Sequence, residues 1–150
     1  MRWFRRGQRH EADLDTDQVR QVLLDEMAAL PAGAVSLDRT ENGAYRLVPR
    51  TADAFPVVVD DYSDGLHVFV ADIAAPIEIA APLNINYGKP NQRWDEDLRE
   101  VVSLVATGAA LVGRAAAGDP LCLVLEGSRM GVDRSLSSSA ARLARGAVWS

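Results

Sequence analysis

The side chains that could carry out nucleophilic or acid–base chemistry are few in this chain. Its 150 residues include one cysteine, Cys122, and two histidines, His10 and His67. A catalytic thiol needs a base within hydrogen-bonding distance, and His10 lies in a segment without apolar periodicity. Cys122 and His67 both alternate with apolar residues in predicted strands, which favours a buried structural thiol. The sequence therefore yields no catalytic residue and favours, without settling, a protein that is not an enzyme.

Two other stretches match binding loops only in part. GRAAAG (113–118) has the glycine spacing of a phosphate-binding loop, but Asp119 and Pro120 stand where that loop needs Lys and Ser or Thr. DDYSDG (60–65) begins like a calcium-binding loop, yet Tyr62 and Ala71 occupy two positions that must supply oxygen ligands. We therefore predict no metal site and no cofactor.

The stretch LNINYGKPNQRWDED (83–97) holds the best candidates for a binding surface. Aromatic residues and arginine are enriched at interaction hot spots, and Tyr87, Arg93 and Trp94 lie within eight residues. The three acids at 95–97 are explained by a helix start, where negative charge is stabilising. Packing against the core is the alternative interpretation for Tyr87 and Trp94. The binding residues that we predict are Tyr87, Lys89, Gln92, Arg93 and Trp94, together with Tyr62 and His67.

Charge is unevenly distributed along the chain. The formal net charge is −5, but residues 1–10 contain four arginines and no acid, so the remainder has 12 basic and 21 acidic side chains and a charge of −9. Such a surface repels nucleic acid and attracts a basic partner. We therefore expect another protein as partner, a basic one being favoured by charge, and no nucleic acid. Residues 1–14 are predicted to be a basic flexible tail, whose Trp3 and Phe4 leave contact with an anionic surface open.

Neither a secretory signal nor a membrane span is visible in the sequence. After the basic opening MRWFRRGQRH, the polar run EADLDTDQ stands where a signal peptide is apolar. The uncharged run from Val101 to Gly113 has 13 residues, whereas a bilayer span needs about 18. A single cysteine also fits a reducing compartment. We expect a cytoplasmic bacterial protein without a transmembrane segment.

Apolar residues at the helical period predict two main helices. The first runs from about Thr16 to Leu30, where Pro31 and Gly33 end it. The second runs from about 95 to 117, with Gly108 inside it as a point of close approach to the sheet. A short third helix is expected near Leu136–Arg145.

The residues between the two main helices are predicted to be strands joined by tight turns. Apolar runs predict strands at 34–40, 44–50, 55–61, 65–72 and 76–82, the last one an edge strand between two prolines. Asn42 and Gly43 predict a two-residue type I′ hairpin, in which both residues need positive φ. Leu83–Tyr87 is predicted to be an irregular strand end, and a further strand is expected at 121–127.

These elements predict a single α+β domain over residues 15–150. It consists of an antiparallel meander of four to six strands, an N-terminal helix, a long helix packed on the sheet and a short C-terminal helix. This order of elements resembles that of small bacterial immunity proteins and secretion-chaperone-like domains, a likeness without shared motif residues. The resemblance implies binding to another protein without catalysis.

The expected function is therefore that of a non-enzymatic protein-binding module. It would resemble either an immunity protein or a secretion chaperone or adaptor. The alternative is a small-molecule-binding domain or minor enzyme, with a pocket between the sheet and the long helix lined by His67, Tyr62 and Tyr87. A regulatory domain that acts through its arginine-rich tail is a third interpretation. An exposed edge strand could also pair two copies of the chain into a homodimer.

Overall fold

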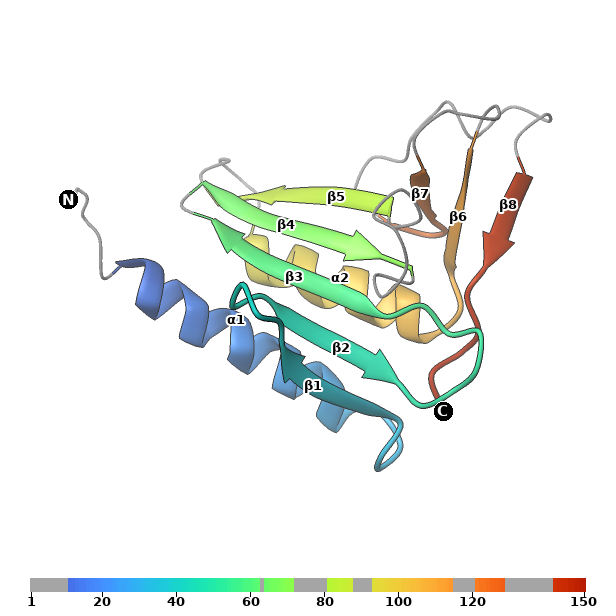
Figure 1. The fold of residues 1–150 in the computed structure, drawn as a ribbon, viewed down its shortest axis with the longest axis horizontal. Helices are drawn as coiled ribbons and strands as arrows, with labels where there is room; N and C mark the ends of the chain where they lie inside the picture. The colour runs from blue at the N-terminus through green and yellow to red at the C-terminus, as the bar shows by residue number, and fades with distance from the viewer. Residues whose placement is uncertain (1–10, 63, 72–80, 88–92, 115–120, 129–141) are drawn as a thin grey trace.

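The computed structural model describes residues 11–62, 64–71, 81–87, 93–114, 121–128 and 142–150. These ranges hold a five-stranded and a three-stranded antiparallel sheet and two helices (Figure 1). The α+β class and the antiparallel sheet predicted from the sequence are confirmed. In chain order the elements are α1 Glu11–Ala28, β1 Val35–Arg39, β2 Tyr45–Pro49, β3 Val57–Tyr62, β4 Gly65–Val70, β5 Ala81–Asn86, α2 Trp94–Ala106, β6 Ala110–Arg114, β7 Cys122–Leu125 and β8 Arg142–Arg145.

The five-stranded sheet is a meander in which each strand pairs with the next along the chain. Its first hairpin is confirmed, but the loop is longer than the predicted two-residue turn. β1 and β2 pair only as far as Arg39 and Tyr45, and Gly43 has a φ of +87° while Asn42 is not among the described residues with positive φ. Thr40 and Ala44 close the loop: the Thr40 N–H donates to the Ala44 carbonyl at 2.8 Å, and the Thr40 hydroxyl accepts from the Ala44 N–H at 3.0 Å. These bonds leave residues 41–43, and not two residues, in the turn.

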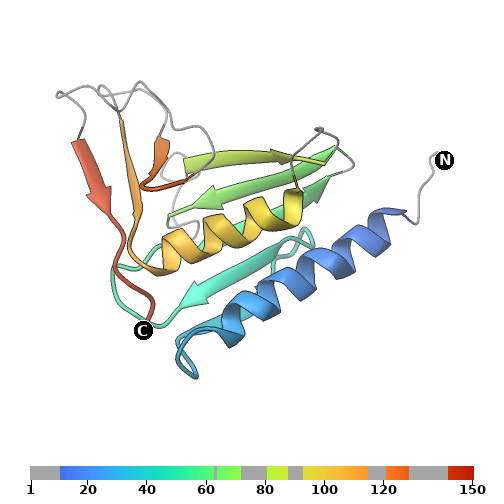
Figure 2. The ribbon, with the colours of Figure 1, turned by 180° about the vertical axis from the view of Figure 1, so that it is seen from behind.

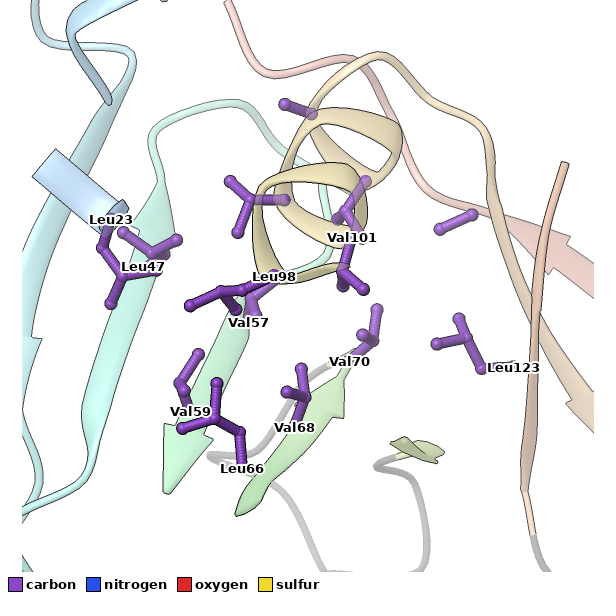
Figure 3. Close-up of a cluster of buried hydrophobic side chains, with 14 of the residues drawn as sticks. Leu23, Leu47, Val57, Val59, Leu66, Val68, Val70, Leu98, Val101 and Leu123 are labelled. Atoms are coloured by element: carbon purple, nitrogen blue, oxygen red, sulfur yellow. The ribbon is translucent and has the colours of Figure 1, made fainter. Parts of the chain in front are cut away.

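Both helices lie on the same face of this sheet (Figures 1 and 2). Alternate strand side chains point to opposite faces, so one set from β2, β3 and β4 meets the apolar stripes of α1 and α2 and forms the core (Figure 3). Fully burying each such side chain stabilises the fold by about 1.5–3 kcal/mol. The core side chains labelled in Figure 3 are Leu23, Leu47, Val57, Val59, Leu66, Val68, Val70, Leu98, Val101 and Leu123.

The long helix ends eleven residues earlier than predicted, since α2 stops at Ala106 rather than near 117. Gly108 follows the cap residue Thr107 with a φ of +82°. Its N–H donates to the Val105 carbonyl and the N–H of Ala109 donates to that of Leu104, which is the hydrogen-bond pattern of a Schellman motif. Gly108 therefore terminates the helix and does not bring its middle close to the sheet.

The residues beyond Gly108 build a second sheet that the sequence did not predict as such. Its strand order is β7-β6-β8, and its strands run crosswise to those of the first sheet (Figure 1). The predicted helix near Leu136–Arg145 is wrong for Arg142–Arg145, which form β8 and pair with β6; residues 136–141 lie outside the described ranges. Pairing with the open edge of β6 outweighs the weak helical period of this segment, as tertiary context often does.

Two further boundaries differ from the prediction. α1 begins at Glu11, inside the range 1–14 expected to be a tail, while residues 1–10 are not described. β5 covers Ala81–Asn86, so most of the stretch expected to be an irregular strand end pairs regularly with β4. β5 is an edge strand of the five-stranded sheet; residues 76–80 of the predicted edge strand are not described.

None of the helices in the described ranges is both long and apolar enough to cross a membrane.

Candidate functional site

Five of the seven predicted binding residues lie at one end of the five-stranded sheet. This end is formed by the end of β3, the start of β4, the end of β5 and the start of α2, at the left of Figure 1. It holds Tyr62, His67, Tyr87, Arg93 and Trp94. The remaining two predicted residues, Lys89 and Gln92, lie outside the described ranges. Four of these residues form two aromatic pairs on opposite faces of the sheet, and Arg93 pairs with acids of α2.

Tyr87 and Trp94 form the first group, on the face that the helices cover. Their rings meet edge to face with centroids 5.6 Å apart, and both side chains are partly buried against the core. The Tyr87 hydroxyl donates a hydrogen bond to the carboxylate of Asp61, which lies on β3 two strands away from β5. Core packing therefore accounts for much of both side chains, as the alternative interpretation held.

Tyr62 and His67 form the second group, on the face away from the helices. Leu66 and Val68, the neighbours of His67 in β4, are buried in the core, so strand alternation turns His67 outward. Its ring packs against that of Tyr62 at a centroid distance of 4.3 Å. Tyr62 is 49% exposed. His67 and Tyr62 thus lie on the other side of the sheet from Tyr87, and these three side chains do not line one pocket between the sheet and α2.

Cross-strand neighbours determine the environment of this outward pair. His67 stands opposite Asp60 in β3 and Asn84 in β5. A side-chain hydrogen bond with Asp60, followed by repulsion from its negative charge, raises the pKa of the Tyr62 hydroxyl above its usual value. The hydroxyl is therefore protonated at neutral pH and can act as a hydrogen-bond donor.

Carboxylates are concentrated at the same end of the sheet, which we call the acidic end. In the described part of residues 60–64 and 93–97, six acids accompany one base, Arg93. Arg93 is 68% exposed and pairs with Asp95 at 3.1 Å and Glu96 at 3.5 Å. No group of three His, Cys, Asp or Glu side chains in the described ranges is arranged to hold a metal ion. The carboxylates are Asp60, Asp61 and Asp64 from the β3–β4 hairpin and Asp95, Glu96 and Asp97 from the first turn of α2.

A cleft of about 460 Å³ opens beside Trp94, where α1 and α2 meet. Arg99 lines it and joins the helices through ion pairs to Asp25 at 3.1 Å and Glu26 at 3.7 Å. Hydrogen bonds from Gln21 and Arg99 lower the pKa of Asp25, whereas burial raises that of Glu26. The residues that line the cleft are Gln18, Gln21, Val22, Arg93, Trp94, Asp95 and Arg99.

Gln18, Gln21 and Arg99 were not among the predicted site residues. Their polar side chains fit the solvent-facing side of two amphipathic helices, which is how the sequence pattern presents them. Their convergence depends on which faces of α1 and α2 adjoin, and helix–helix packing of this kind leaves no local signal in the sequence. Cys122, in β7, lies in a different sheet from His67, so the two residues considered for nucleophilic chemistry belong to separate layers.

Comparison of the chain with protein-family models, with curated proteins and with solved structures found no match.

Proposed function

We propose that this chain is a non-enzymatic, cytoplasmic bacterial protein-binding module that takes a basic segment of its partner at the acidic end. The observation that carries the proposal is the gathering of six carboxylates at this end of the sheet, where the ring of Tyr62 is 49% exposed. Like an immunity protein, a secretion chaperone or an adaptor, it would bind another protein without catalysis. Recognition, and not turnover, is the task for which these groups are arranged.

Charge complementarity supports a basic partner. The described residues of the acidic end have a formal charge of −5 when Arg93 is counted against the six acids. Like-signed charges in one region accelerate the encounter with a partner of opposite sign. Arg93 is already paired with Asp95 and Glu96, and Asp61 already accepts a hydrogen bond from Tyr87. The exposed carboxylate of Asp64, in the turn of the β3–β4 hairpin, is therefore the one that a lysine or arginine of the partner would meet.

The exposed ring of Tyr62 supplies the apolar part of the contact. Tyr62 is one of three large hydrophobic side chains that the described residues expose, with Leu143 and Val148 near β8. A cation beside an exposed aromatic face gains about 0.5–1 kcal/mol, and aromatic residues are enriched at hot spots. Tyr62 and the neighbouring carboxylate of Asp64 thus form a combination suited to a lysine or arginine side chain.

Zero-length crosslinking tests the proposal. The full chain is incubated with a lysate of its source organism, and a carbodiimide joins lysine amines directly to carboxylates with which they are paired. Mass spectrometry of the crosslinked peptides should place the partner's lysines on the β3–β4 hairpin, residues 60–64. Crosslinks concentrated on Glu41, an exposed acid in the β1–β2 hairpin, or spread evenly over the acids of the chain would contradict the proposal.

A further inference from the structure

A second, larger cleft lies at the far end of the molecule from the acidic end, where the two sheets meet. Its volume is about 870 Å³, within the range of about 300–1,000 Å³ typical of small-molecule sites. The five-stranded sheet contributes Val48 and the loop residue Phe55, and the three-stranded sheet contributes Val112. Leu121, which precedes β7, completes these apolar walls. The cleft is therefore large enough for a small ligand with an apolar body.

The ring of Phe55 packs against the backbone of Gly146. A Cβ atom added to Gly146 would fall 2.7 Å from Cδ2 of Phe55 and 2.9 Å from Cγ, so the ring rests on the backbone where any other residue would displace it. Gly146 is in turn held by its N–H, which donates to the Ala110 carbonyl at 3.1 Å. One wall of the cleft is thus an aromatic ring packed directly on the backbone at Gly146.

Two charged residues line the cleft, and only one of them has its charge neutralised. Arg145 donates to the Glu126 carboxylate at 2.5 Å and to the Gly108 carbonyl at 2.9 Å. The ion pair raises the pKa of Arg145 and lowers that of Glu126. In the part of the chain that the structure describes, no donor is bonded to the Asp53 carboxylate. Among the described residues that line the cleft, the Asp53 carboxylate is therefore the charged group without a bonded partner, and it lies beside apolar walls.

Backbone strain is concentrated in the same place. Asp53 has a φ of +65° and Ala71 a φ of +95°, and they are the non-glycine residues of the described ranges with positive φ. Both line this cleft. Aspartate adopts this region more readily than alanine. Conformations of this kind persist where the surroundings enforce them, and they cluster at ligand-binding sites.

From this combination we propose that the cleft binds a small organic cation, an ammonium group carried on an apolar body. The Asp53 carboxylate is the counter-ion of the ammonium group, and the ring of Phe55 with the aliphatic walls covers the apolar body. An ammonium group near an aromatic face and a carboxylate gains from both contacts. This site is separate from the acidic end and does not depend on the function proposed for it.

Three ligands of nearly equal size and different charge test the proposal on the full chain. Phenethylammonium, 2-phenylethanol and 3-phenylpropionate are titrated while the methyl resonances of Val48, Val112 and Leu121 are followed by NMR. Phenethylammonium should shift these methyl groups saturably and bind about three- to ten-fold more tightly than the alcohol, with the carboxylate weakest. Equal affinities, a preference for the carboxylate, or shifts confined to the acidic end would overturn the proposal.

The variant Asp53→Asn gives the second test, because asparagine also tolerates a positive φ and leaves the walls intact. It should abolish the preference for phenethylammonium over the alcohol while both still shift the cleft methyl groups. Asp64→Asn, which removes a carboxylate of the acidic end, is the control and should leave that preference unchanged. A preference that survives Asp53→Asn, or one that Asp64→Asn removes, would overturn the assignment.

Discussion

The rings of Tyr62 and His67 pack across β3 and β4 with their centroids 4.3 Å apart, on the face of the sheet that faces away from both helices. The register places Asp60 directly opposite His67, and Asp60 is hydrogen-bonded to Tyr62. The next residue of β3, Asp61, points to the other face of the sheet and accepts a hydrogen bond from the Tyr87 hydroxyl. Consecutive residues of one strand thus divide between the outward face of the sheet and the support of the core.

The hydrogen bond to Asp60 should be visible in the titration of Tyr62. Since the pKa of the folded state is raised, the stabilisation is complete below the unfolded value of about 10 and is lost as the pH rises through the folded value. Asp60→Asn should move the ionisation of Tyr62 to lower pH. Phenolate absorbance measures this, with Tyr62→Phe identifying which transition belongs to Tyr62; an unchanged transition in Asp60→Asn would refute the contact.

Replacing Gly108 by alanine should destabilise the fold. Gly108 has a φ of +82°, and an added Cβ would lie 3.2 Å from Cγ2 of Val148. Left-handed backbone costs an L-residue about 1–2 kcal/mol, and the contact with Val148 adds to this. Gly127→Ala is the matched control, because Gly127 has a φ of +80° with nothing within 4 Å of the added atom. Denaturant unfolding should show a larger loss for Gly108→Ala; equal losses would mean that the contact with Val148 costs nothing.

Trp149 should be a major contributor to stability although it lies outside the regular elements. It is 2% exposed, and its backbone N–H donates to the carbonyl of Ala106, the last residue of α2, at 2.8 Å. Trp149→Ala should lower the free energy of unfolding by about 3–5 kcal/mol. The adjacent Val148 is 54% exposed, so Val148→Ala should change it by less than about 0.5 kcal/mol. Similar losses for the two variants would contradict this packing.

The sequence predicted what depends on local periodicity and missed what depends on tertiary pairing. Strand alternation correctly grouped Leu66, Val68 and Val70 on one face and turned His67 to the other. The run from Val101 to Val112 is uncharged and keeps its apolar residues at the helical period, so the pattern could not show that Gly108 adopts positive φ and divides the run between α2 and β6. The sequence around Arg142–Arg145 likewise contains no local signal that this segment pairs with β6. The candidate residues of the acidic end were found by residue type, whereas the cleft beside Asp53 joins segments far apart in the sequence.

Removing the Tyr62 ring should weaken partner binding without unfolding the protein. The side chain is 49% exposed, and truncation of a hot-spot aromatic costs about 1–2 kcal/mol or more of binding energy. Tyr62→Ala should therefore raise the Kd of the complex with the captured partner about ten-fold. Val148→Ala removes a comparably exposed side chain elsewhere and should leave the Kd unchanged. If both variants bind like the wild type, Tyr62 does not lie in the interface.

Charge reversal at the β3–β4 hairpin is the most direct test of the proposal that the acidic end receives a basic partner. The Kd of the captured partner for Asp64→Lys and for Glu41→Lys is measured by fluorescence anisotropy at low and at physiological salt. Both residues are exposed acids in hairpin loops of the same sheet. We predict that Asp64→Lys weakens binding about ten-fold or more at low salt, less so at higher salt because of screening, while Glu41→Lys changes it less than about two-fold. Equal effects of the two substitutions, or none from Asp64→Lys, would contradict the proposed function.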